Sequence, residues 1–136
     1  MQTDVKYPTI IQGGMGIAVS SWQLAKQVAL AGELGVISGT AIDSVVARRL
    51  QDGDLSGDIR RAMSHFPNQK TIAEIMDRFF VEGGRSADKP YLDVPKLSIK
   101  GNLFSNNLLA VSSFVEVWLA KEGHNGLIGM NILEKI

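Results

Sequence analysis

A glycine-rich turn between a short apolar run and a helix start constrains this chain most. Segment 8–21 reads PTIIQGGMGIAVSS. Its apolar pair, Ile10 and Ile11, predicts a short strand that is covered on both faces. The three glycines that follow allow positive φ and the close approach of a flat or anionic ligand. Ser20 with Gln23 fits a capping box, so a helix is expected to start directly after Ser20. A strand that enters a helix through such a turn is where α/β proteins place their chemistry.

The first 38 residues predict a strand, a helix and a second strand. The helix is expected over about residues 21–31, with Gly32 as its C-terminal stop. The run LGVIS at 34–38 predicts a second buried strand. The short connections indicate a βαβ unit, whose strands are parallel. A long helix over about 105–122 and a third parallel strand at 127–131 follow later in the chain.

The segment between the second and third strands is longer than a crossover requires. It covers 88 residues, from 39 to 126, whereas a whole βαβ motif takes about 30 residues. The long helix can serve as the crossover, so residues 42–101 are predicted to be a helical insertion. This insertion follows the carboxyl end of a strand, which carries active sites in α/β folds. It is interpreted either as a lid or wall beside a ligand pocket, or as a structural elaboration or subunit contact.

Within the insertion, turn residues set the expected element boundaries. Thr40, with Asp43 three residues later, is predicted to cap a helix that ends at Gly53. Two more helices are expected over about 55–66 and 69–81, and an edge strand at 96–100.

Composition excludes several classes of protein. The 136 residues include 14 basic and 14 acidic side chains, so no overall field attracts nucleic acid or an acidic membrane. The chain has no cysteine, which excludes disulfides, thiolate metal sites and a cysteine nucleophile. Its N-terminus lacks the pattern of a signal peptide, and the apolar stretch 108–119 is interrupted by polar residues. We therefore expect a cytoplasmic protein with a small-molecule substrate, no membrane segment and no metal site.

Two kinds of ligand compete for the glycine turn. Gly14 and Gly16 begin the GxGxxG pattern of dinucleotide-binding folds, but Val19 occupies the third glycine position. The second strand also ends in Ser38, Gly39 and Thr40 rather than in an acidic residue that could hold a ribose. Both departures count against a dinucleotide; the competing candidate is a flavin ring that lies across the ends of parallel strands.

The strand-end motifs resemble those of the nitronate monooxygenase (2-nitropropane dioxygenase) family. The matching segments are PTIIQGGMG at 8–16, LGVISGT at 34–40 and GMN at 129–131. Members of that family are FMN-dependent TIM barrels that oxidise alkyl nitronates. The resemblance implies an α/β fold that forms the N-terminal part of a TIM (β/α)8 barrel: three parallel strands with a helical insertion after the second. The segment 42–101 matches only a subgroup that carries the name by similarity.

The resemblance also implies which residues form a flavin site. Backbone groups of Gly14, Met15 and Gly16 would hydrogen-bond the flavin N5 and pyrimidine edge, with the Met15 thioether against the ring. The site would be completed by the residues at the two other strand ends: Gly39, Thr40 and Asn131. The amide of an asparagine offers both a donor and an acceptor to the ring.

No catalytic acid or base is assigned. His65 is interpreted as a helix-end residue, and His124 as a structural turn residue, since the N-terminal face of a barrel serves stability. Glu134 and Lys135 follow the third strand on the site side and are interpreted as a solvated ion pair.

Three strands are fewer than a barrel needs, and barrel phosphate sites usually lie after the seventh and eighth strands. We expect residues 1–136 to be a partial FMN-binding domain, with the catalytic base downstream of residue 136. Alone, the chain should bind FMN weakly or not at all and associate as a homo-oligomer through open strand edges. The alternatives are a flavin-dependent enoyl-ACP reductase of the same superfamily and a non-catalytic oligomerisation or binding module.

Overall fold

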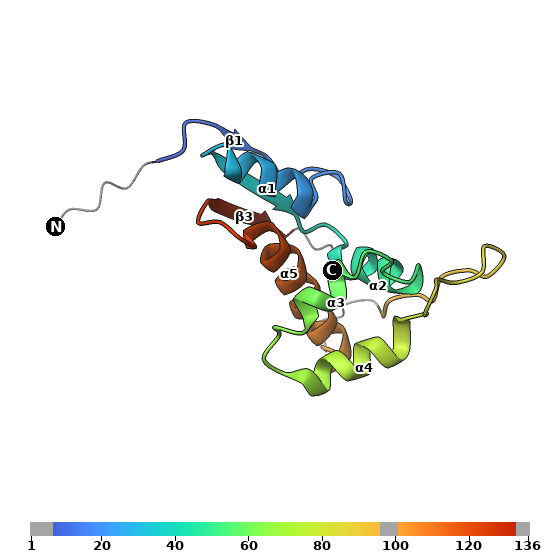
Figure 1. Cartoon of the computed structure of the whole chain (residues 1–136). Helices are drawn as coiled ribbons and strands as arrows, with labels where there is room; N and C mark the ends of the chain where they lie inside the picture. Colours follow the sequence, from blue (N-terminus) through green and yellow to red (C-terminus); the bar gives the residue numbers. More distant parts are fainter. Residues whose placement is uncertain (1–6, 96–100, 133–136) are drawn as a thin grey trace.

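Three parallel strands form an open sheet in the order β1-β2-β3 (Figure 1). The computed structural model describes residues 7–95 and 101–132. The strands are β1 Ile11–Gln12, β2 Leu34–Ser38 and β3 Leu127–Asn131, and the helices are α1 Trp22–Leu30, α2 Ile42–Gln51, α3 Asp58–Met63, α4 Gln69–Phe79 and α5 Leu103–Lys121. The predicted βαβ unit, its parallel pairing and the third strand are confirmed. The predicted edge strand at 96–100 lies outside the described residues, as do Glu134 and Lys135.

The register of the sheet brings the carboxyl ends of the strands to one edge. Leu34 of β2 pairs with Ile11 on one side and with Leu127 on the other, and Ser38 pairs with Asn131. β1 has only two residues, but the amide of Gln12 continues its pairing. That amide accepts a hydrogen bond from the N–H of Val36 at 3.2 Å and donates one to its carbonyl at 3.1 Å.

One face of the sheet is covered by α1 and α5, and the other is open. Gly35 and Ile37 are buried on the covered face, where a Cβ at Gly35 would lie 2.1 Å from the carbonyl oxygen of Ala25 in α1. On the other face, Ile11 is 64% exposed and Leu127 is 47% exposed. Among the described residues, no helix covers this face, although parallel sheets usually have both faces covered.

α5 joins the sheet to the helices of the insertion, as Figure 1 shows. Its buried apolar residues are Leu108, Val111, Val115 and Leu119, which pack in one cluster with side chains of α2, α3 and α4. The insertion is therefore helical, as predicted, but it shares a core with the crossover helix. By length and composition alone α5 could cross a membrane; here it is a core helix of the described fold.

The glycine stop predicted after α1 is correct, whereas the two predicted hydroxyl N-caps are not. Gly32 adopts φ 86°, and its N–H donates to the carbonyl of Ala29, so the expected stop after α1 is confirmed. The expected caps at Ser20 and Thr40 are wrong. α1 is preceded by Ser21 and α2 by Ala41, and neither residue makes a side-chain cap bond.

Two other helices begin or end at different residues from those expected. α3 covers only Asp58–Met63 because Asp54 accepts hydrogen bonds from the N–H groups of Ile59 and Arg60, which fixes the helix start. α5 begins at Leu103, two residues early, because the side chain of Asn102 caps it by accepting from the N–H of Ser105.

Candidate functional site

The strand ends place the predicted site residues together at the carboxyl edge of the sheet. We call residues 13–20, 39–41 and 131 the strand-end rim. The amide of Asn131 donates to the carbonyl of Gly14 at 2.7 Å and accepts from the N–H of Gly39 at 3.3 Å. This one side chain therefore links the turn after β1 to the turn after β2. It keeps one amide hydrogen and further lone-pair capacity for another partner.

Glycine is needed at two rim positions because the chain packs against itself there. A Cβ at Gly14 would lie 2.9 Å from both Asn131 Oδ1 and the carbonyl oxygen of Ile37. A Cβ at Gly39 would lie 2.3 Å from the carbonyl oxygen of Asn131. The space that these glycines leave is filled by Asn131 and β2, whereas Gly13 has no atom within 4 Å of its ideal Cβ position.

Two serines fix the shape of the glycine turn. The hydroxyl of Ser20 accepts a hydrogen bond from the N–H of Met15 at 3.0 Å and donates to the carbonyl of Gly13 at 3.2 Å. The hydroxyl of Ser38 donates to the carbonyl of Gly16. Both serines are buried. These roles were not predicted, since the sequence pattern indicated a helix cap at Ser20 and only a strand end at Ser38.

The rim offers backbone donors and an exposed thioether. The N–H of Met15 is already used by Ser20, but those of Gly14 and Gly16 make no hydrogen bond within the described residues. The side chain of Met15 is 70% exposed, beside two further exposed apolar residues, Ile17 and Val19. No charged side chain belongs to the rim residues. This set suits hydrogen bonding to a neutral polar ring edge with apolar contact to the ring face.

Two rim residues have strained backbone. Ala18 and Ala41 adopt φ values of 58° and 51°, in the left-handed region that non-glycine residues rarely occupy. Strained backbone of this kind persists where the surroundings impose it and clusters at ligand-binding sites. Ala41 lies where β2 turns into α2, so the strain lies at the junction of the rim and the insertion.

The buried carboxylate of Glu116 fixes the start of α1, which follows the glycine turn of the rim. Glu116 of α5 accepts from the N–H of Trp22, the first residue of α1, at 3.1 Å and from Arg49 Nη1 at 2.6 Å. It thereby takes the place of the expected Ser20 cap. Burial raises the pKa of Glu116 above its usual value, and the charge of Arg49 and the Trp22 N–H act against that rise. No local motif marks this role, because Glu116 lies 94 residues from Trp22.

Both histidines have structural contacts away from the rim. His65 follows α3, and its ring stacks on Trp118 with centroids 4.5 Å apart. His124 Nδ1 accepts from the N–H of Gly126 and Nε2 lies against the carbonyl of Ala120, so the ring closes the turn before β3. Within residues 7–95 and 101–132, no group of three or more acidic or histidine side chains could hold a metal ion.

Comparison of the chain with protein-family models, curated proteins and solved structures finds no match. The chemistry of the rim therefore has to be inferred from its own residues. These provide hydrogen-bond donors and acceptors, an exposed thioether and no acidic or basic side chain.

Proposed function

We propose that the strand-end rim is one side of an FMN site in an oxidoreductase that resembles nitronate monooxygenase. The observation that carries the proposal is the contact between the three strand ends. The motifs after β1, β2 and β3 each resemble that family, and Asn131 hydrogen-bonds both other turns. Parallel strands bring their carboxyl ends to one edge in any case, so the specific support is that the Asn131 side chain bonds to both other turns.

The rim residues would bind and orient the flavin. The free N–H groups of Gly14 and Gly16 are donors for the polar edge of the ring, and the exposed side chain of Met15 can lie against its face. Thr40 would line the site beside them. When bound, FMN would supply the oxidation of a carbon acid such as an alkyl nitronate, with dioxygen as the electron acceptor.

The open sheet face supports a barrel as the complete fold. Ile11, Leu34 and Leu127 share that face, as the register shows, and it would become the interior of a closed sheet. Closing a barrel needs strands beyond β1–β3. The proposed domain of residues 1–136 is therefore one part of the flavin site, and its activity belongs to the completed barrel.

The test is a titration of FMN fluorescence with the chain, both alone and expressed with the coding sequence downstream of residue 136. We expect weak or no binding by the chain alone and saturable binding by the longer product. Met15→Glu should weaken binding at least about tenfold by placing a charge at the ring face. Leu103→Glu, which changes an equally exposed residue of α5, is the matched control. Micromolar binding by the monomeric chain would contradict the need for further strands, and a longer product indifferent to Met15→Glu would contradict the rim assignment.

Anaerobic reduction of the bound flavin separates the two flavin chemistries. Bleaching by an alkyl nitronate alone would favour the oxidase reaction, whereas bleaching by NADPH alone would favour an enoyl-ACP reductase. The uncovered sheet face also favours a third candidate, a non-catalytic oligomerisation module. A stable oligomer that binds no FMN in either form of the protein would support that candidate instead.

A further inference from the structure

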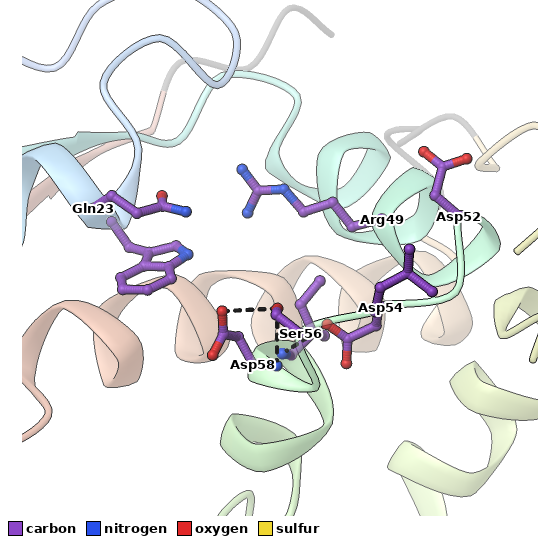
Figure 2. A pocket seen from close by; sticks show the side chains of 9 residues that line it. Gln23, Arg49, Asp52, Asp54, Ser56 and Asp58 are labelled. Carbon is purple, nitrogen blue, oxygen red and sulfur yellow. Dashed lines mark hydrogen bonds between the residues drawn. The ribbon is translucent and has the colours of Figure 1, made fainter. Parts of the chain in front are cut away.

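A cleft lies between the first turn of α1 and the segment that joins α2 to α3 (Figure 2). Its volume is about 370 Å³, within the range of small-molecule sites. It is lined by Trp22, Gln23, Arg49, Asp52, Asp54, Leu55, Ser56, Asp58 and Ile59. None of these residues belongs to the strand-end rim. We propose that this cleft binds a small organic carboxylate and that Arg49 is its anchor.

Arg49 is held in place and has an unused binding edge. Its Nη1 is fixed by Glu116, which is itself fixed by the N–H of Trp22. Its Nε and Nη2 make no hydrogen bond within the described residues, and the side chain is 31% exposed. Figure 2 shows the guanidinium reaching toward Gln23. These two nitrogens form one side of a planar fork, whose parallel N–H groups match the two oxygens of a carboxylate.

Each aspartate of the cleft has an arginine partner, which reduces its repulsion of such a ligand; Arg61, the partner of Asp58, also pairs with Glu122 at 3.0 Å. Asp52 pairs with Arg85 at 3.4 Å, Asp54 with Arg60 at 3.1 Å and Asp58 with Arg61 at 2.8 Å. The carboxylate of Asp52 also points away from Arg49 and Gln23 in Figure 2. Once these pairs are formed, the open edge of Arg49 is the strongest donor that faces the cleft.

The rest of the lining selects an organic ligand over an inorganic anion. Trp22, Leu55 and Ile59 provide apolar surface, and Leu55 is 81% exposed with nothing yet packed on it. A ligand with a carboxylate for Arg49 and an apolar body for these side chains uses both parts of the cleft. Phosphate or sulfate would use only the first.

The experiment titrates the chain with benzoate and follows the fluorescence of Trp22. The chain has two tryptophans, so Trp118→Phe leaves Trp22 as the sole reporter. We expect saturable binding with a dissociation constant on the order of 1 mM, as is typical of so small a ligand. Benzamide, the uncharged analogue, should bind about tenfold more weakly because it cannot make the charge-assisted pair. Equal affinity for benzamide, or tighter binding of benzylamine, would overturn the proposal.

Two variants and one control variant assign the binding to this cleft. Arg49→Lys keeps a cation beside Glu116 but removes the fork, so benzoate affinity should fall about tenfold. Arg48→Lys, on the same helix but outside the cleft, should leave it unchanged. Leu55→Asp, at an exposed wall position, should weaken benzoate but not benzamide by charge repulsion. Benzoate affinity that is absent in the folded protein, or that Arg49→Lys does not change, would refute the proposal. No FMN is used, so neither result depends on the flavin proposal.

Discussion

Replacing Arg49 by glutamine should destabilise the fold by leaving the buried Glu116 without its charged partner. The Glu116 side chain is 1% exposed, and its short contact with Arg49 Nη1 is its only ion pair in the described structure. Removing one partner of a buried ion pair leaves an uncompensated charge. We expect a loss of about 2–4 kcal/mol at neutral pH, below the full cost for a buried pair because Arg49 is itself partly exposed.

The loss should depend on pH with a definite sign. Burial raises the pKa of Glu116, so the folded state holds this proton more tightly than the unfolded state. Its contribution to stability is therefore greatest at acid pH and falls as pH rises through the folded-state pKa. In Arg49→Gln the opposing charge is gone and the pKa of Glu116 should rise further. The variant should then be closest to the parent at acid pH and furthest from it at alkaline pH.

The assay is chemical denaturation of the parent, Arg49→Gln, Glu116→Gln and the double variant from acid to alkaline pH. The double variant should recover about 1–3 kcal/mol relative to Arg49→Gln, because a neutral amide removes the stranded charge. Arg48→Gln is the control, since Arg48 lies on the same helix and stacks on Tyr91 without a buried acid. A loss below about 0.5 kcal/mol, or one that is the same at both ends of the pH range, would refute the reasoning.

Two further predictions concern the rim backbone. Gly39→Ala should cost at least about 2 kcal/mol because its Cβ would lie 2.3 Å from the carbonyl oxygen of Asn131, whereas Gly13→Ala, with free space, should cost less than about 1 kcal/mol; equal losses in thermal denaturation would contradict the close approach. Ala41→Gly should stabilise the fold by about 0.5–1 kcal/mol because it relieves a φ of 51°, and a lower melting temperature for this variant would show that the left-handed backbone is not strained.

Sequence periodicity was sufficient to predict the strands and helices, but not the contacts that fix where they begin. The β2 and β3 strands and the helices of the insertion follow from apolar spacing and glycine stops, which are local signals. The start of α1 does not, because Ser20 is drawn into the glycine turn by its bonds to Met15 and Gly13. The N–H of Trp22 is then satisfied by Glu116 from a distant helix. A capping pattern in the sequence cannot show such a long-range substitution.

The convergence of the strand ends was predicted, but the contacts among their residues were not. The strand ends placed Gly14, Gly39 and Asn131 together, because parallel strands expose their carboxyl ends at one edge. The glycines and Asn131 were predicted to contact a ligand, whereas in the structure much of their space and hydrogen bonding is used within the rim. The unused N–H donors of Gly14 and Gly16 could be identified only from the structure, because it shows that the N–H of Met15 donates to Ser20.

The rim is held mainly by hydrogen bonds. Its order should therefore depend on whether the exposed sheet face is covered. The side chains of Gln12, Ser20, Ser38 and Asn131 supply its hydrogen bonds, while the apolar clusters lie under the helices on the other side. Hydrogen bonds next to water contribute little net stability and strengthen when water is excluded. Covering Ile11 and Leu127 would therefore both bury apolar surface and stiffen the rim. Order at the rim and closure of the sheet should accordingly rise together, each favouring the other.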